Sequence, residues 1–233
     1  GALLRKNGVD HIKGSGVLKD KSTVVVDGGD AITTENIIIA TGAREKEIPS
    51  LPVDRETVIT SREALDTREI PSKVVIVGGG ATGAEFAHIY NTYGSEVTIV
   101  ELMPRIVPLE DEDVSQQLEK IFKKRGIRIM AGSGVQGIDV DNGKATVRVM
   151  RDSEDSLIEC DKVLVAVGVQ GNIENIGLEI VGIETERNFI TVDDNMLTNV
   201  EGIYAIGDVT GKMLLAHVAS AQGVTAVENM AGL

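Results

Sequence analysis

The feature that most constrains this chain is a glycine cluster between an apolar run and a helix-forming segment. The run KVVIV at 73–77 is rich in β-branched residues, and Gly78, Gly80 and Gly83 then take the three defined positions of a G-x-G-x-x-G pattern. Residues 81–93 carry apolar side chains at helical spacing, and EVTIVE follows at 96–101. Strand, glycine turn, helix and strand within about 30 residues predict a parallel βαβ unit.

In such a unit each glycine meets a separate steric demand. Gly78 makes a tight turn, Gly80 lets the backbone approach a pyrophosphate, and Gly83 lets helix and strand pack closely. The pyrophosphate then faces free backbone amides at the helix N-terminus, which includes Ala81 and Thr82. We therefore expect a dinucleotide site whose attraction for a dianion comes from backbone amides and the helix dipole.

An acidic residue selects between the two common dinucleotides. Glu101 ends the second strand, 21 residues after Gly80, and its carboxylate can accept hydrogen bonds from both ribose hydroxyls. A 2′-phosphate about 4 Å away would be repelled by about 4 kcal/mol per charge pair at an effective dielectric near 20. Arg105 is the one nearby cation that would favour such a phosphate. On balance the sequence predicts NAD rather than NADP.

Composition excludes several other classes of function. The formal charge of −13 disfavours nucleic acid and anionic membrane surfaces as partners. Apolar runs of four to six residues are far short of the ~20 that span a bilayer, and no secretory leader is visible, so the cytoplasm is the expected location. One cysteine, Cys160, cannot form an intramolecular disulfide and is expected to be a structural thiol. The three histidines belong to no cluster with metal spacing, so no metal site is expected.

The rest of the chain predicts further strands and two more helices. A helix is expected at 110–125, and strands near 127–130, 135–140 and 145–150 predict a small antiparallel meander. An amphipathic helix near the C-terminus is expected to carry Val218, Ala221, Val224 and Val227. Four apolar strands end in glycine, in the segments IIIATG, VVIVGGG, VLVAVG and IYAIGD. Since ligands of open α/β sheets bind outside the carboxyl ends of the strands, these glycines predict cofactor clefts.

Four segments together resemble the pyridine nucleotide-disulfide oxidoreductases: VVIVGGGATGAEFA, VTIVELMPRIVP, VLVAVG and TNVEGIYAIGDV. The similarity covers essentially the whole chain and is greatest to the members that reoxidise the dihydrolipoyl groups of 2-oxoacid dehydrogenase complexes. It implies FAD and NAD as cofactors and a homodimeric parent. It also implies an α/β fold, a Rossmann-like parallel sheet with an antiparallel β meander. Residues 71–196 would be the NAD domain, and 1–70 and 197–233 parts of a second, flavin-type domain.

The resemblance assigns roles residue by residue. Glu85 matches a catalytic-site glutamate that pairs with a lysine near flavin and nicotinamide, and Gly168 matches a glycine on the nicotinamide side. The remaining matches concern the flavin: a chain crossover at Thr41 and Gly42, a motif at Gly207 and Asp208 in which the aspartate holds a ribityl hydroxyl, and backbone under the flavin ring at Ala216 and His217.

Several family motifs are absent from the sequence. It holds no earlier G-x-G-x-x-G, no C-x-x-x-x-C redox pair and no C-terminal dimerisation domain with a His-Glu pair. We therefore expect a fragment that binds NADH weakly, holds no flavin tightly and has no lipoamide activity. Two alternatives stay open: an NADH oxidase, peroxide reductase or mercuric reductase of the same superfamily, and a free-standing NAD-binding module. Residues 1–70 argue against the module, because they read as an incomplete flavin domain.

Overall fold

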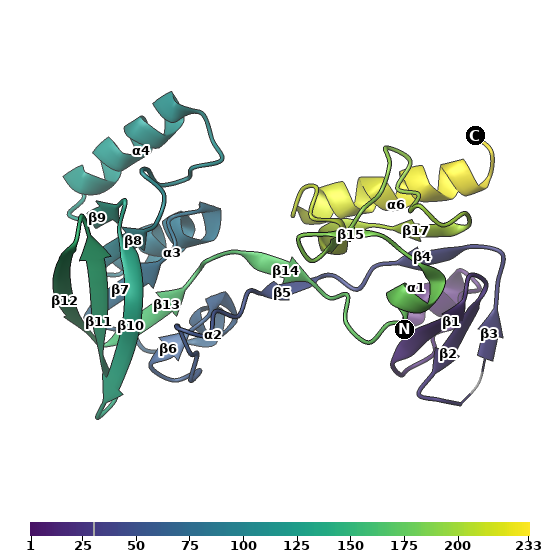
Figure 1. Ribbon diagram of the computed structural model, residues 1–233, viewed down its shortest axis with the longest axis horizontal. Helices are drawn as coiled ribbons and strands as arrows, with labels where there is room; N and C mark the ends of the chain where they lie inside the picture. The colour runs from purple at the N-terminus through teal and green to yellow at the C-terminus, as the bar shows by residue number, and fades with distance from the viewer. Residues whose placement is uncertain (30) are drawn as a thin grey trace. The chain divides into compact units, whose positions relative to one another are not determined.

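The computed structural model describes residues 1–29 and 31–233 and divides into two compact units (Figure 1). Unit 1 comprises Gly1–Arg44 and Gln170–Leu233, and unit 2 comprises Glu45–Val169. The chain leaves unit 1 through β5 (Ala43–Glu45) and returns through β14 (Val169–Gly171), and these two strands pair with each other.

These units have other limits than the domains predicted at 1–70, 71–196 and 197–233. Residues 45–70 belong to unit 2, because β6 (Val58–Ile59) pairs in parallel with β13 (Lys162–Val165) in its sheet. Residues 170–196 belong to unit 1, where Leu178 and Ile190 pack in the same core as Leu18. Both differences come from contacts between segments distant in sequence, which local pattern does not reveal.

Unit 2 is built on a parallel five-stranded sheet in the order β6-β13-β7-β8-β9. The predicted βαβ unit forms its centre, since β7 and β8 are neighbours and the helix between them crosses one face. The helices and remaining strands of the sheet are α2 (Ser61–Asp66), β7 (Lys73–Val77), α3 (Ala81–Thr92), β8 (Glu96–Glu101), α4 (Glu112–Lys124) and β9 (Arg128–Ala131).

Strand alternation divides the apolar side chains of the sheet between two cores. Val74 and Ile76 point to the face covered by α3 and α4, where they pack with Phe86 and Phe122. Val75 and Val77 point to the opposite face and pack in one core with Val147 and Val149 of the antiparallel meander. Because both faces are covered, the strands carry the continuous β-branched runs typical of buried parallel sheets.

The meander contains β10 (Gly134–Asp141), β11 (Lys144–Arg151) and β12 (Glu154–Cys160), paired antiparallel in chain order. The sequence predicted β10 and β11 and missed β12. The prediction also counted the segment 127–130 as a meander strand, which was wrong, because this segment overlaps β9, which pairs in parallel with β8. This edge strand is rich in charged residues and exposes Leu157, so its apolar alternation is weak. Cys160 closes β12 and is buried, where desolvation raises its pKa to about 11, as expected of a structural thiol.

Unit 1 contains small sheets around its own core. Strands β1 (Gly16–Asp20), β2 (Thr23–Val26) and β3 (Ala31–Thr33) form an antiparallel sheet, and β4 (Ile37–Ile39) pairs in parallel with β17 (Ile203–Ala205). The other elements are α1 (Ala2–Lys6), α5 (Leu178–Val181), β15 (Thr185–Glu186), β16 (Phe189–Ile190), the 3-10 turn η1 (Gly207–Thr210) and α6 (Ala216–Met230).

The buried face of α6 differs from the predicted one. Val224 and Val227 are more than half exposed, whereas Gln222 and Ala226 are buried. Ala226 packs on Tyr204 of β17. The prediction was wrong because it followed the apolar side chains, while the fold buries Ala226 against β17 and Gln222 against the amide of Gly207.

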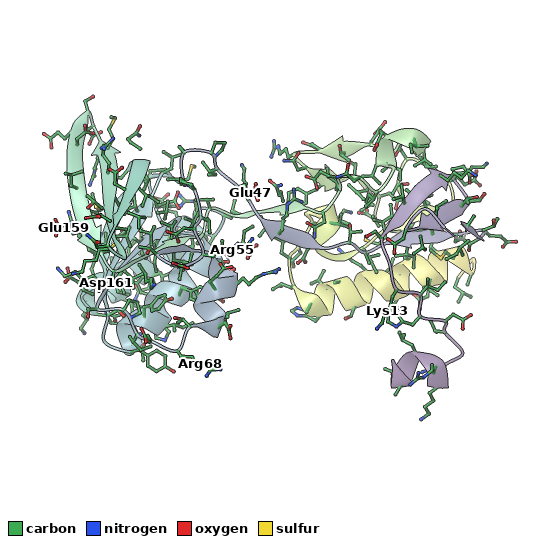
Figure 2. All side chains as sticks on the ribbon, turned by 90° about the horizontal axis from the view of Figure 1, so that it is seen from below. Lys13, Glu47, Arg55, Arg68, Glu159 and Asp161 are labelled. Atoms are coloured by element: carbon green, nitrogen blue, oxygen red, sulfur yellow. The ribbon has the colours of Figure 1, made fainter. Side chains whose placement is uncertain are left out.

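The observed α/β architecture, with a parallel sheet and an antiparallel meander, confirms the predicted fold class. Charged side chains labelled in Figure 2, such as Lys13, Glu47 and Glu159, are exposed on their own units. Within the described residues, no helix is long and apolar enough to cross a membrane.

Candidate functional site

The glycine cluster forms a tight turn between β7 and α3, and its three defined positions have contrasting surroundings. A Cβ atom on Gly78 would overlap the carbonyl oxygen of Ala166, and its φ of +104° is one that side chains rarely adopt. A Cβ on Gly83 would overlap the carbonyl oxygen of Gly78. A Cβ on Gly80 would meet nothing within 4 Å. Two of the glycines are therefore required by packing, and the third leaves open space above the backbone.

That open space lies at the N-terminus of α3. Gly80 is the N-cap residue, so no side chain caps the helix, and Ala81 and Thr82 in the first turn are exposed. The first amides of a helix have no partner within it, and the helix dipole makes this end partly positive. The turn is thus an exposed group of backbone donors that an anionic group can approach closely.

Glu101 lies next to this turn, buried and held by backbone amides. Its Oε2 accepts a hydrogen bond of 2.5 Å from the amide of Gly79, and its Oε1 accepts one of 2.7 Å from the amide of Met103. A carboxylate has about four acceptor positions, so two remain for a ligand. The structure therefore brings Glu101 and the glycine turn together, with the carboxylate already oriented.

Arg105, the cation that could favour a 2′-phosphate, is occupied by its own loop. One guanidinium nitrogen donates to the carbonyl oxygens of Pro108 and Glu110 at 3.3 and 3.2 Å. The other lies 3.9 Å from the carboxylate of Glu112 at the start of α4. These bonds direct the guanidinium toward the loop and the helix start, which supports the prediction that Glu101 decides the cofactor.

Gly168 follows the neighbouring strand. It lies three residues beyond the end of β13, is exposed and has a φ of +99°. Residues 166 and 167 of the same segment approach Gly78 closely. The carboxyl ends of β7, β8 and β13 thus bring together the glycine turn, Glu101 and the Gly168 segment, as sequence reasoning expected of an open α/β sheet.

Glu85 lies one turn along α3 from Ala81 and is exposed. It lines a cavity of about 430 Å³ between α3 and α4, together with His88 and Arg125 and an apolar floor that includes Phe122. His88 Nδ1 and Arg125 Nη1 are 2.8 Å apart. No described contact ties down the Glu85 carboxylate, so it is free to meet a partner.

The residues assigned to flavin gather in unit 1 at the carboxyl ends of its two parallel strands. Ile206 donates its amide to the carbonyl oxygen of Ile39, which places Thr41 and Gly42 beyond β4 beside Gly207 and Asp208 beyond β17. The amide of Gly207 donates to Oε1 of Gln222, in the second turn of α6, at 2.7 Å. Ala216 and His217 lie exposed at the start of the same helix. Asp208 is half-buried.

The family model for "Pyridine nucleotide-disulphide oxidoreductase" matches residues 2–223. The chain belongs to this family. It is 43% identical to a dihydrolipoyl dehydrogenase of Mycobacterium leprae and 45% identical to one of Chlorobaculum tepidum. Each match covers 99% of this chain, and 51% and 50% of those proteins. The chain therefore spans about half the length of the curated relatives it matches.

Solved structures of this family have the same fold. The crystal structure of LpdA from Mycobacterium tuberculosis matches with a TM-score of 0.88 and 32% identity, over 99% of this chain and 52% of that one. A Cu(II) complex of RclA from Escherichia coli, an HOCl-induced flavoprotein disulfide reductase, matches with a TM-score of 0.84 and 26% identity, over 99% and 54%. These findings confirm the resemblance drawn from the sequence motifs.

Sequence reasoning missed two sets of residues. Gly79 occupies a position where the fingerprint allows any residue, yet its amide orients Glu101. A cluster around Arg44 and Asn172 joins the two passages of the chain between the units, β5 and the segment after β14. No local pattern predicts this cluster, because its contacts join residues about 130 positions apart. Among the described residues, no group of three His, Cys, Asp or Glu side chains is arranged to hold a metal ion.

Proposed function

We propose that unit 2 binds NAD(H) and that the whole protein is a dihydrolipoyl dehydrogenase. In this proposal the protein oxidises dihydrolipoyl groups of 2-oxoacid dehydrogenase complexes with NAD⁺, through FAD and a redox disulfide. The observation that carries it is the contrast within the glycine turn, since packing requires glycine at 78 and 83 while Gly80 faces open space. An empty position over helix amides fits a pyrophosphate, which needs the backbone to come within hydrogen-bonding distance.

Each residue of the turn then has a defined task. The amides of Ala81, Thr82 and Gly83 bind the pyrophosphate, and the two free acceptor positions of Glu101 receive the ribose hydroxyls. Glu101 also excludes a 2′-phosphate, because the carboxylate is buried and its charge is poorly screened. Gly168 leaves room beside the nicotinamide. When bound, FAD and NAD supply the hydride chemistry, and the protein orients them.

The flavin roles are proposed for the whole protein, in which unit 1 forms part of the FAD domain. The half-buried Asp208 would hold a ribityl hydroxyl, with Thr41, Gly42 and Gly207 beside it and the backbone at Ala216 and His217 under the ring. Among the described residues of unit 1, β4 and β17 are the one pair of parallel strands. Parallel sheets rarely stand with two strands and an uncovered edge, which supports completion of this sheet by further strands. We propose that the whole protein is a homodimer.

Glu85 is proposed as a catalytic-site residue of the whole protein. It is exposed on α3, one turn after the proposed pyrophosphate amides, and so is placed to pair with a lysine beside the flavin.

A related disulfide reductase is the second candidate function, favoured by the structural similarity to RclA. A dihydrolipoyl dehydrogenase would oxidise dihydrolipoamide with NAD⁺ when the whole protein is assayed, and a related disulfide reductase would not.

Calorimetric titration of this chain with NADH and NADPH tests the cofactor proposal. We expect NADH to bind more tightly, and Gly80→Ala to weaken NADH binding at least about tenfold, equivalent to about 1.4 kcal/mol. Gly137→Ala is the matched control, because a Cβ there also meets nothing within 4 Å and the residue lies in the meander. Equal NADH affinity of the Gly80→Ala and Gly137→Ala variants, or a preference for NADPH, would contradict the proposal.

A further inference from the structure

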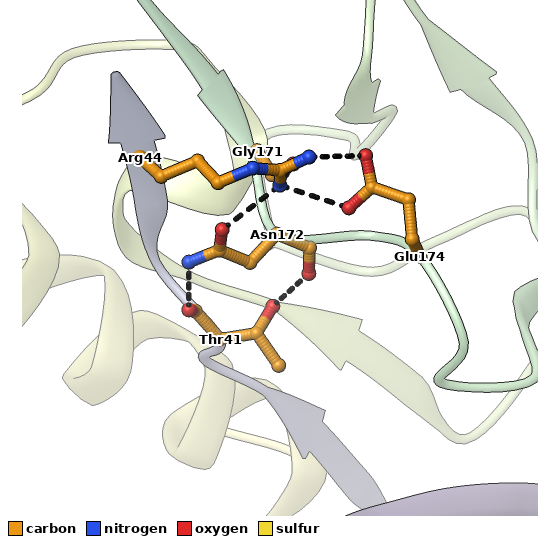
Figure 3. A network of polar contacts seen from close by, with 5 residues as sticks. All are labelled: Thr41, Arg44, Gly171, Asn172 and Glu174. Carbon is orange, nitrogen blue, oxygen red and sulfur yellow. Dashed lines mark hydrogen bonds and ion pairs between the residues drawn. The ribbon is translucent and has the colours of Figure 1, made fainter. Parts of the chain in front are cut away.

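Two strands carry the chain between the units, and a polar cluster ties them together on the unit 1 side. We name the side chains of Thr41, Arg44, Asn172 and Glu174 the connection clamp (Figure 3). All four residues belong to unit 1. Thr41 lies shortly before the first passage, β5, and Arg44 lies within it, while Asn172 and Glu174 follow the second passage, β14. The hydrogen bonds between these two pairs join residues 128 to 131 positions apart in sequence.

The strongest contact of the clamp is a fork between Arg44 and Glu174. Nη2 of Arg44 donates to Oε1 of Glu174 at 2.7 Å, and Nη1 donates to Oε2 at 2.9 Å. The Arg44 hydrogen bond is the largest of the causes that lower the pKa of Glu174 to about 2. A two-point bond between planar groups fixes their mutual orientation as well as their distance. The fork therefore resists twisting of one passage against the other.

Asn172 joins this fork to the backbone. Its Oδ1 accepts from Arg44 Nη1 at 3.1 Å, and its Nδ2 donates to the carbonyl oxygen of Thr41 at 2.9 Å. The hydroxyl of Thr41 donates back to the carbonyl oxygen of Asn172 at 2.7 Å. The amide of Asn172 also donates to the carbonyl oxygen of Gly42. Every polar atom of the Asn172 side chain is thus used across the two passages.

We infer that Arg44 and Glu174 are positioning residues that hold the two connecting segments, at β5 and after β14, in a fixed arrangement. Through these contacts the two segments move together with unit 1 as one rigid body. Changes in the orientation of unit 2 are then confined to the chain beyond the clamp, after Arg44 and before Gly171. This inference goes beyond the proposed function and does not depend on it.

Distances between spin labels on the two units test this inference. Glu228→Cys in α6 and Lys120→Cys in α4 provide exposed sites. The native Cys160 is buried with a pKa raised to about 11, so it reacts slowly with thiol reagents. We expect Arg44→Gln to broaden the distance distribution, and Arg44→Glu combined with Glu174→Arg to restore it. Arg148→Gln, which breaks an exposed ion pair within the meander, is the matched control and leaves it unchanged.

Hydrogen exchange gives a second measurement on the same variants. The amide of Asn172 is expected to exchange about tenfold faster in Arg44→Gln, while meander amides keep their rates. Thr41→Val removes one hydrogen bond but keeps the fork, so it provides a milder variant if Arg44→Gln fails to fold. Unchanged label distances and unchanged Asn172 exchange in a folded variant would overturn the inference. NADH titration of these variants separates the two proposals, because all four clamp residues lie outside unit 2.

Discussion

The carboxylate of Glu101 and the amide of Gly79 are joined by a hydrogen bond of 2.5 Å, which links the end of β8 to the glycine turn after β7. The carbonyl of Gly79 accepts a second bond of 2.6 Å from the amide of Val107. Both polar backbone groups of Gly79 therefore hold the acid and its loop in place. This contact sets the position of the Glu101 carboxylate, which we propose binds the ribose, before any ligand arrives.

Replacement of Glu101 by glutamine is expected to weaken both folding and NADH binding. Two backbone donors face the carboxylate, and an amide group would present a donor to one of them. Such a buried mismatch costs about 1–3 kcal/mol of unfolding free energy, measurable by urea denaturation. We expect calorimetry to show a loss of about tenfold in NADH affinity and a smaller loss for NADPH. Glu96→Gln, at the exposed start of the same strand, is the control and changes neither quantity strongly.

Replacement of a closely packed glycine in the turn is expected to lower the stability of the fold, and not the affinity for NADH alone. Alanine at Gly83 would overlap the carbonyl oxygen of Gly78 in the buried contact between helix and strand. We expect Gly83→Ala to lower the unfolding free energy by about 3 kcal/mol, within the range seen for overpacked cores. Gly80→Ala should keep the parent's urea midpoint. Similar urea midpoints for Gly83→Ala and Gly80→Ala would show that the turn relaxes around the added methyl group. That result would contradict a packing requirement for glycine at position 83.

Two buried tyrosines predict opposite effects of removing a hydroxyl. The hydroxyl of Tyr90 has no hydrogen-bond partner within the described residues, whereas that of Tyr204 and Oδ1 of Asn229 are 2.8 Å apart and hydrogen-bonded. Tyr90→Phe is therefore expected to keep or raise stability, because an unsatisfied polar group leaves the core. Tyr204→Phe should cost about 1 kcal/mol. Thermal or urea unfolding measures both, and a clear loss of stability in Tyr90→Phe would contradict this assignment.

The clamp predicts a pH dependence of stability in the acid range. Because the pKa of Glu174 is lowered to about 2 from a usual value of 4.5, its contribution is fully present above pH 4.5 and is lost as the pH falls toward 2. The side chain is 48% exposed, so solvent screening keeps the contribution below about 1 kcal/mol. The difference in urea midpoint between the parent and Glu174→Gln should shrink between pH 5 and pH 2, since protonation makes the two alike. A constant difference over this range would contradict the ion pair.

Local pattern predicted the elements whose contacts are close in sequence. The β-branched run before Gly78, the helical spacing after it and the acid at Glu101 lie within one βαβ unit, so their spacing alone indicated the parallel pair. The meander was predicted only in part, because β12 has many charged residues and pairs at an edge of its sheet. The buried face of α6 was predicted wrongly, because close packing on Tyr204 favours small Ala226 over the larger valines.

The sequence by itself determined the fold class and the glycine turn with its acid, because these depend on steric demands between residues close together in the chain. The family was recognised from the resemblance of four sequence motifs, which the family model confirmed. Tertiary structure alone decided the limits of the two units, the role of Gly79 and the connection clamp. Arg44 and Glu174, for example, are 130 residues apart, and neither carries a local sign of the other. These two side chains come into contact only when both connecting segments have folded onto unit 1. The apolar pattern of a single segment therefore cannot predict their contact.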